Sequence, residues 1–362
     1  MKTFLLCVVI LVALEILFRL GHWFRYRRPY HVSIKFPWNE GCVVPHPYLS
    51  FAYRRNSAIL INQRLPYELH PNDYFSFKEP LHLNNYGHFG EDFASTKEPG
   101  VIRIACLGAS TTANNIATDI RDFTYPALLR DMLEAAMPQK RFEVFNCGIG
   151  GWVSADILIN YILNLSDLNL DYIILYHGYN DLYLHLSDDV RSDYSHNRKN
   201  FGEVIHRIKR AYYFPKFRFW HSYEFIKDRL LGTGNVRNDV LRLLVKHGVD
   251  IEADFKTLSI EQENFRKLLV LAQHKGTRVI LSSFAFYDFR NDLVSKRYGQ
   301  GVFLENALMA ELADEFAALF VNQAELIPQD KRYFVDSIHF TPEGMTLLAR
   351  NFANKLLAEL KG

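Results

Sequence analysis

The feature that most constrains the fold is a regular alternation of short apolar runs with longer amphipathic segments, which begins at Val101 and continues to the C-terminus. The apolar runs have the length of buried strands, and apolar residues in the longer segments recur at helical spacing. The predicted strands are 101–108, 141–147, 171–178, 277–284 and a short one at 319–322. The predicted helices are 124–137, 154–165, 262–276, 306–320 and 341–360. This alternation predicts an α/β fold with a parallel sheet that helices cover on both faces.

The composition restricts the class of protein before any motif is considered. Hydrophobic residues make up 49% of the 362 residues and charged residues 23%, so the chain can bury a packed core. The formal net charge is +2, which gives no reason to expect a nucleic-acid partner. The four cysteines include no CxxC pair, so a zinc site of the usual spacing is not predicted.

The N-terminal segment differs from the rest of the chain. Residues 4–20, FLLCVVILVALEILFRL, are apolar apart from Glu15 and Arg19. This length is at the lower limit of the roughly 17–25 residues that a membrane-spanning helix needs, and no A-x-A-like cleavage site follows it. We therefore expect residues 1–28 to form an uncleaved, single-pass membrane anchor, with a removed signal peptide or a buried helix as the alternatives. Arginines after the run favour the cytoplasmic side for the remaining chain, although the side stays open.

Two further regions precede and interrupt the alternating pattern. Residues 29–98 are rich in Pro, His, Tyr and Asn, and we expect short strands and loops packed on the main domain. The main domain would then cover 99–362, with an insertion at about 182–258. Within the insertion, 206–221 is basic and aromatic. It is interpreted as a surface helix and turn, with a lid or a membrane-facing lip over the active site as the alternative.

Small or polar residues follow the first three predicted strands. Ser110 lies in GAST after the first, Gly151 ends NCGIGG after the second, and Asn180 lies in GYND after the third. In open α/β sheets ligands bind beyond the carboxyl ends of the strands. A serine offers a hydroxyl and a backbone N–H there, a glycine lets the backbone approach a ligand, and an asparagine offers an uncharged N–H donor.

A fourth patch, DSIH, places Asp336 three residues before His339, directly before the last predicted helix. This spacing brings both side chains to one side of a tight turn. The carboxylate can then hold one ring nitrogen of the histidine and leave the other for a serine hydroxyl, as in a catalytic triad.

Each patch taken alone has a simpler interpretation: a turn serine that caps a helix, a tight turn at Gly151, an Asn-Asp turn, or a loop aspartate beside a partly buried histidine. A dinucleotide-binding loop is not favoured, because Val153 stands where G-x-G-x-x-G would need its last glycine. The simpler interpretations do not explain why all four patches occur together in this order.

The four patches resemble the signature blocks of the SGNH hydrolases, also called GDSL esterases and lipases, over roughly 101–362. The family's Ser, Gly, Asn and His match Ser110, Gly151, Asn180 and His339. The most specific pieces are GxND and DxxH. The chain departs from the family at Ala109, where GDS has an aspartate, which weakens the motif without removing the nucleophile.

The resemblance implies a three-layer α/β/α sandwich with a central parallel sheet of about five strands. It also implies acyl transfer by a triad of Ser110, Asp336 and His339, with an oxyanion hole formed by Ser110, Gly151 and Asn180. No metal or organic cofactor is expected. The expected substrates are short-chain acyl esters of glycans or lipids.

Three other functions compete with an esterase. An O-acyltransferase would use the same acyl-serine with a carbohydrate acceptor, and the sequence does not separate it from a hydrolase. A non-catalytic binding protein on this fold is disfavoured because all the triad residues are present. A dinucleotide-dependent redox enzyme is disfavoured by the incomplete glycine pattern.

Two other polar features of the sequence are not expected to be functional sites. A group in the insertion could be drawn as a metal site but is interpreted as a solvated, flexible loop; its members are His185, Asp188, Asp189, Asp193 and His196. Asn164 begins an N-x-[ST] sequon inside a predicted helix, so glycosylation is not expected there.

Overall fold

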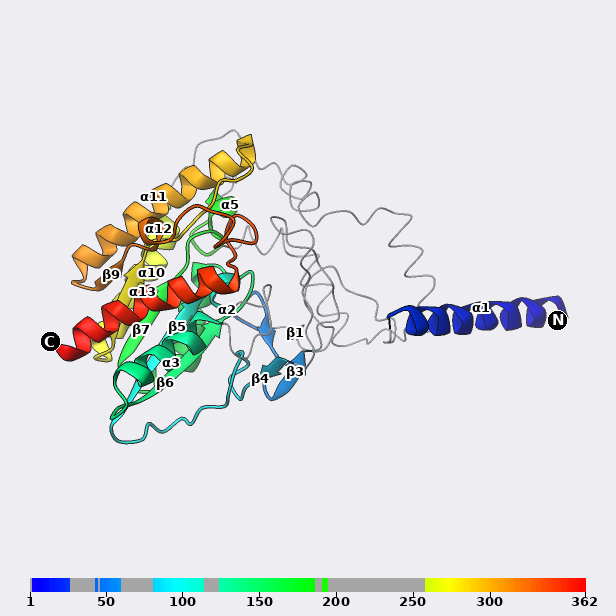
Figure 1. Cartoon of the computed structure of the whole chain (residues 1–362), viewed down its shortest axis with the longest axis horizontal. Coiled ribbons are helices and arrows are strands. Elements are labelled where there is room, and N and C mark those ends of the chain that lie inside the picture. Colours follow the sequence, from blue (N-terminus) through cyan, green and yellow to red (C-terminus); the bar gives the residue numbers. More distant parts are fainter. Residues whose placement is uncertain are drawn as a thin grey trace.

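The computed structural model describes residues 2–26, 43–44, 46–59, 81–113, 124–185, 191–194 and 258–362. Its centre is a five-stranded sheet in the order β6-β5-β7-β8-β9, in which every pairing is parallel (Figure 1). The strands are β5 (Val101–Gly108), β6 (Arg141–Gly148), β7 (Tyr172–Tyr176), β8 (Arg278–Ser282) and β9 (Leu319–Val321). The expected parallel sheet of five strands is therefore confirmed.

Helices cover both faces of this sheet. They are α2 (Ser110–Ala113), α3 (Tyr125–Ala136), α4 (Ser154–Asn160), α5 (Leu182–His185), α10 (Ser259–His274), α11 (Leu293–Glu315), α12 (Gln323–Leu326) and α13 (Pro342–Lys361). Helix α3 packs on α13, whereas α10 packs on both α4 and α11. Because the β5–β6 connection runs along the sheet in the opposite direction to the later ones, right-handed crossovers place α3 on the opposite face from α4 and α10. Figure 1 shows α3 and α13 together on the near face.

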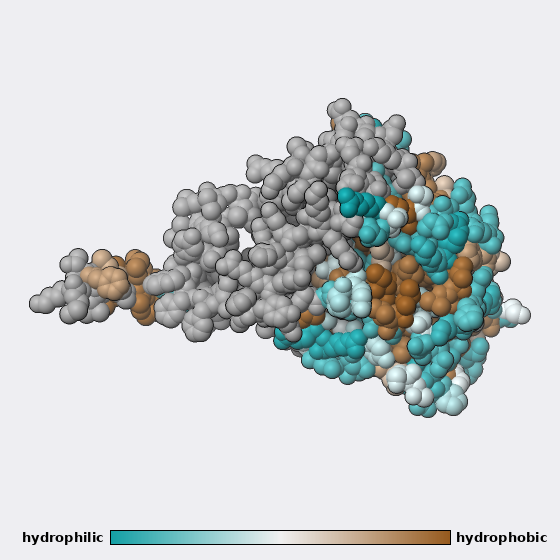
Figure 2. All heavy atoms as spheres, turned by 180° about the vertical axis from the view of Figure 1, so that it is seen from behind, coloured by the Kyte–Doolittle hydropathy of each residue, from teal (hydrophilic) through white to brown (hydrophobic). Residues whose placement is uncertain are grey.

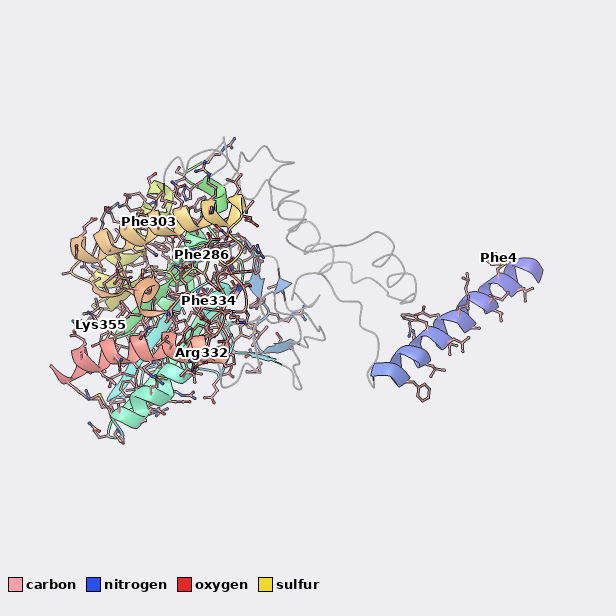
Figure 3. The ribbon with its side chains drawn as sticks, turned by 45° about the horizontal axis from the view of Figure 1, so that its top comes forward. Phe4, Phe286, Phe303, Arg332, Phe334 and Lys355 are labelled. Carbon is pink, nitrogen blue, oxygen red and sulfur yellow. The ribbon has the colours of Figure 1, made fainter. Side chains whose placement is uncertain are left out.

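Two predicted helices differ from those observed. Helix α11 begins at Leu293 rather than at 306, with the Asp292 side chain accepting a hydrogen bond from the backbone N–H of Ser295 (2.8 Å). Phe303 on α11 is 73% exposed, whereas Phe334, in the loop before α13, is completely buried; both are labelled in Figure 3. The predicted helix 154–165 is α4 followed by a π-helix at Tyr161–Leu165.

The N-terminal segment forms a helix, α1 (Lys2–Tyr26). Its apolar side chains include the exposed Phe4, Leu14 and Leu17, and apolar side chains of this helix are brown at the left of Figure 2. A search of the described helices finds none that combines the length and apolarity required to cross a bilayer, so the predicted spanning anchor in residues 1–28 lacks support.

The stretch 29–98 contributes short antiparallel pairs where the structure describes it. β1 (Val43–Val44) pairs with β2 (Ala52–Tyr53), and β3 (Ser57–Ile59) pairs with β4 (Leu81–Leu83). Phe51, Tyr53, Leu83, Phe89 and Phe93 are buried in the same core cluster as the strands of the main sheet. Of the predicted insertion, only 182–185, 191–194 and 258 are described, so the basic segment 206–221 lies outside the described residues.

A buried arginine joins this stretch to the sheet. Arg103, on β5, has no solvent exposure and bonds the carboxylate of Glu143 on β6 at 2.6 Å. Its other guanidinium N–H groups donate to the backbone carbonyls of Ala94, Thr96 and Leu168, each at 2.9 Å. A buried charge is costly unless it is paired and hydrogen-bonded, and these acceptors together satisfy that requirement.

Candidate active site

Ser110 stands where β5 ends and α2 begins, and its side chain is turned inward. The turn depends on glycines that pack without a side chain. A Cβ on Gly108 would lie 2.1 Å from Thr112 Oγ1 and 2.4 Å from the carbonyl oxygen of Tyr176, and one on Gly148 would lie 2.4 Å from the backbone nitrogen of Ala113. Any other residue at either glycine would push α2 away from the sheet, and Ser110 with it.

His339 reaches Ser110 from the loop before α13, 229 positions along the chain. Its Nε2 lies 2.9 Å from Ser110 Oγ, and its Nδ1 lies 2.7 Å from Asp336 Oδ2. The side chains of Ser110 and His339 are both largely buried. The three residues therefore form the continuous hydrogen-bonded chain that a serine, histidine and aspartate triad requires.

Asp336 is fixed by the backbone of its own turn. Its Oδ1 accepts hydrogen bonds from the N–H groups of Ile338 and His339, both at 2.8 Å. Burial alone would raise the pKa of this carboxyl, but the charge and hydrogen bond of His339 and the two N–H donors outweigh burial and hold the pKa below its ordinary value. Asp336 is therefore ionised at neutral pH and orients the imidazole.

Two of the three residues proposed for the oxyanion hole lie on loops: Gly151 follows β6, and Asn180 follows β7. Gly151 has φ of +82°, a left-handed conformation that glycine adopts without strain. The Asn180 side-chain nitrogen donates to the carbonyl oxygen of Trp152 at 2.8 Å. An amide nitrogen carries two hydrogens, so this bond orients the group and leaves a second donor for a ligand. The oxyanion role of Ser110, Gly151 and Asn180 stays a prediction.

Asp181, next to Asn180, holds a buried network that the sequence did not reveal. It has no solvent exposure and accepts hydrogen bonds from the backbone N–H of Ser154 (2.9 Å) and from the hydroxyls of Ser154 and Tyr194 (both 2.6 Å). His177 Nε2 lies 2.7 Å from Asp181 Oδ2, the oxygen that also accepts the Ser154 N–H, whereas both hydroxyls bond Oδ1. The only signal in the sequence was a second polar residue beside Asn180 in GYND.

This network joins the loop that carries Asn180 to the start of α4. Burial opposes the charged form of both partners, but their mutual hydrogen bond and attraction outweigh burial: the pKa of His177 is raised and that of Asp181 lowered. Asn264, on α10, also donates to the Ser154 hydroxyl at 3.0 Å. An ion pair thus sits beneath the Asn180 loop and ties three elements together.

Two buried glutamates lie beside this ion pair. Glu261 on α10 and Glu305 on α11 have no solvent exposure. Burial raises the pKa of Glu305 to about 7, and burial together with Glu305 raises that of Glu261 well above its usual range. These directions fit a carboxyl pair that holds at least one proton at neutral pH.

Among the described residues, His177, Asp181 and Glu261 form a group that could hold a metal ion, with ligand atoms within 4.8 Å of one another. The 2.7 Å contact of His177 with Asp181 is a hydrogen-bond distance. Two ligands about 2.0–2.1 Å from one tetrahedral metal would lie farther apart, at roughly 3.3 Å. The arrangement therefore favours a shared proton over a shared cation.

The interpretation of the insertion's polar group as a solvated loop does not hold for His185. This residue has no solvent exposure, and its Nε2 lies 3.4 Å from the hydroxyl of Tyr194, which donates a hydrogen bond to Asp181. His185 ends the short helix α5, in which Leu182 and Leu184 are also buried. Asp193 is exposed, while Asp188, Asp189 and His196 lie outside the described residues.

A model of the GDSL-like lipase/acylhydrolase family matches residues 106–347. No curated protein sequence matches this chain.

Among solved structures, LAE5, an alpha/beta hydrolase enzyme from the metagenome of Lake Arreo, Spain, has 16% identity and a TM-score of 0.45, and the match covers 70% of this chain and 94% of LAE5. The acetylxylan esterase Axe2 of Geobacillus stearothermophilus has 15% identity and a TM-score of 0.43, over 70% of this chain and 93% of Axe2. The acetyl xylan esterase AlAXEase has 13% identity and a TM-score of 0.41, over 70% of this chain and 98% of its own.

Asp181→Asn tests the network beneath the Asn180 loop. The substitution removes the buried negative charge that His177 and Tyr194 require, so we expect the free energy of unfolding to fall by about 3 kcal/mol. The displaced Asn180 donor should lower kcat for an ester substrate by roughly tenfold or more with little change in KM. Denaturant unfolding and steady-state kinetics measure the two effects.

The matched control for this substitution is Asp314→Asn, an exposed aspartate on α11. It should change neither quantity. If Asp181→Asn retained the kcat of the unaltered protein, the network would have no part in placing Asn180.

Proposed function

Because the chain belongs to the GDSL-like lipase/acylhydrolase family and is a hydrolase of ester bonds, we propose that it is a serine esterase that acts through a covalent acyl-serine on Ser110. The observation that supports this proposal most strongly is the 2.9 Å contact between Ser110 Oγ and His339 Nε2. It is the distance at which an imidazole can take the hydroxyl proton.

In the first half-reaction, His339 Nε2 accepts the Ser110 proton while Oγ forms a bond to the carbonyl carbon of the ester. The resulting oxyanion accepts hydrogen bonds from the backbone N–H groups of Ser110 and Gly151 and from the Asn180 amide. Asp336 stabilises the imidazolium through Nδ1. Cleavage of the ester C–O bond releases the alcohol, which leaves with the proton from His339.

In the second half-reaction, water replaces the alcohol. His339 takes a proton from the water while the water oxygen attacks the carbonyl carbon of the acyl-serine. His339 then returns that proton to Ser110 Oγ as the carboxylic acid leaves. Every group that this cycle needs is a side chain or backbone N–H of the chain.

We propose short acyl groups, such as acetyl on a glycan or lipid hydroxyl, as the portion of substrate that enters the site. The support is the limited access to the reacting atoms: Ser110 is 9% exposed and His339 8%. A small acyl group needs little room beside these atoms, whereas a long chain would need an apolar groove leading to them.

The nucleophile is tested with a fluorophosphonate probe, which reacts with an activated serine hydroxyl. The probe should label the unaltered protein and fail to label Ser110→Ala, and it should label His339→Ala at least about 10³-fold more slowly because the general base is lost. Mass spectrometry of the labelled peptide identifies the modified residue. Ser95→Ala, an exposed serine outside the site, is the control and should be labelled normally. Labelling that persists in Ser110→Ala would refute the proposal.

Acyl-chain preference is tested with p-nitrophenyl esters of increasing length. We expect kcat/KM to be at least about tenfold higher for the acetate than for the palmitate, a difference of about 1.4 kcal/mol in transition-state stabilisation. The measurement uses monomeric ester concentrations, so that micelles do not limit access. A higher kcat/KM for the palmitate would overturn the short-chain proposal.

We also propose that the protein is membrane-attached through α1. Support comes from the exposed apolar side chains of this helix, among them Phe4, Leu14 and Leu17. The full chain should float with phospholipid vesicles in a density gradient, and a variant carrying Leu14→Glu and Leu17→Glu should float less because charge opposes burial in lipid. The control Leu326→Glu changes an exposed leucine on α12 and should not alter flotation. Equal flotation of the two α1 forms would contradict the proposal.

A further inference from the structure

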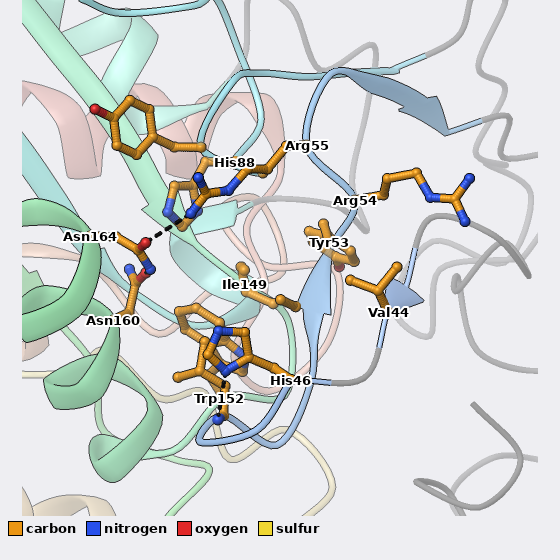
Figure 4. A pocket seen from close by; sticks show the side chains of 14 residues that line it. Val44, His46, Tyr53, Arg54, Arg55, His88, Ile149, Trp152, Asn160 and Asn164 are labelled. Atoms are coloured by element: carbon orange, nitrogen blue, oxygen red, sulfur yellow. Dashed lines mark hydrogen bonds between the residues drawn. The ribbon is translucent and has the colours of Figure 1, made fainter. Parts of the chain in front are cut away.

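A cavity that is lined by none of the triad residues lies beside the loop that carries Gly151. It has a volume of about 370 Å³ and lies between the stretch before β5 and the main domain (Figure 4). Ile149 and Trp152, which flank Gly150 and Gly151, form part of its wall. Pockets of roughly 300–1,000 Å³ accommodate small organic ligands.

The polar side chains that line the cavity come from two motifs of the stretch 29–98 and from the segment α4–π-helix. They are His46, Arg54, Arg55, His88, Asn160 and Asn164. No carboxylate is among the lining residues that the structure describes, and Arg55 contributes a positive charge to this wall. A concave site of this kind attracts anions.

Arg55 is the cation best placed for a ligand. It is exposed, and its guanidinium donates to the side-chain oxygen of Asn164 at 2.9 Å, an uncharged acceptor (Figure 4). The guanidinium also lies 5.8 Å from the centre of the Tyr86 ring, which holds it over an aromatic face. An amide oxygen fixes the direction of the guanidinium but does not neutralise it, and a carboxylate would make a stronger, charge-assisted bond.

His88 supplies an unused polar group inside the cavity. It is 1% exposed, and neither ring nitrogen has a hydrogen-bond partner. Burial and the nearby charge of Arg55 lower its pKa to about 4, so the ring is neutral at pH 7, with one donor and one acceptor. Buried polar groups are normally hydrogen-bonded, and a ligand hydroxyl could bond one of these two ring nitrogens.

The remaining lining alternates amide and aromatic surfaces. Asn164 donates to the side-chain oxygen of Asn160 at 2.9 Å, so the two amides and Arg55 form one hydrogen-bonded row. Tyr53, Tyr86 and Trp152 supply aromatic surface to the same cavity. Sugar rings present hydroxyls at their edges and C–H groups on their faces, which matches amide and aromatic walls respectively.

We propose that this cavity binds an acidic sugar, with its carboxylate on Arg55 and its hydroxyls on His88 and the Asn160–Asn164 row. This assigns a binding role to the His-, Arg- and Tyr-containing motifs of the stretch before β5. A bound ligand touches the loop of Ile149 and Trp152, and so lies against the backbone that carries Gly151. The site does not depend on the esterase chemistry, since no reacting atom of Ser110 takes part.

Isothermal titration calorimetry on the full chain tests the proposal, with D-glucuronate, D-glucose and inorganic phosphate as separate probes. We expect D-glucuronate to bind at least about tenfold more tightly than D-glucose, because only the former offers a carboxylate to the guanidinium. Arg55→Gln should remove that difference, and Asn164→Ala should weaken D-glucuronate binding. Arg55 is exposed and Asn164 is partly buried, so neither substitution disturbs the core. Circular dichroism verifies that each variant is folded.

The control is Arg130→Gln, which removes an exposed arginine on α3 that does not line the cavity. It should bind D-glucuronate like the unaltered protein. Phosphate bound as tightly as D-glucuronate would overturn the sugar assignment, and no binding of D-glucuronate, or binding that survives Arg55→Gln, would overturn the site. Fluorophosphonate labelling of Ser110 reports the triad separately, so failure of one proposal is distinguishable from failure of the other.

Discussion

The parallel register of β5 with its two neighbours is the constraint on which the site depends. Gly108 is paired with Gly148 on β6 and with Tyr176 on β7, so three strands end at the same level. The residues that follow them are Ser110, the Gly151 loop and the Asn180 loop. Side-chain atoms would not fit at Gly108 or Gly148. The close approach of these strand ends, rather than any single hydrogen bond, places Ser110 at the same edge of the sheet as the loops of Gly151 and Asn180.

The fold and the triad residues were accessible from the sequence because each leaves a local signal. Buried parallel strands appear as continuous apolar runs, and the polar residues after them mark the edge of the sheet where ligands bind. The convergence of His339 on Ser110 could also be inferred, since His339 lies in the segment after the fifth strand, which starts from the same edge of the sheet. The bounds of β5 and β6 were predicted to within one residue, whereas β7 and β8 are each five residues long where eight were expected.

Other features could not be predicted from the sequence, because they depend on residues that are distant in the chain or because nearby residues suggest a different structure. The first part of α11 contains Gly299 and Gly301, which lower helix propensity and conceal the helix. Asp181 looks like a turn residue in sequence, and its partners Ser154, Tyr194 and His177 come together only in the folded chain. The cavity beside Trp152 is likewise assembled from segments that are distant in sequence.

The guanidinium of Arg103 links the stretch 29–98 to the main domain, between which the sequence predicts a boundary near residue 98. Its carbonyl acceptors at Ala94 and Thr96 lie before that point, and its carboxylate partner Glu143 lies in the sheet. Moving residues 94–96 away from β5 would remove two carbonyl acceptors from a cation that the fold buries completely, which costs free energy. We therefore expect local opening of the connecting segment to be coupled to that of the sheet, and hydrogen exchange in the two to follow each other.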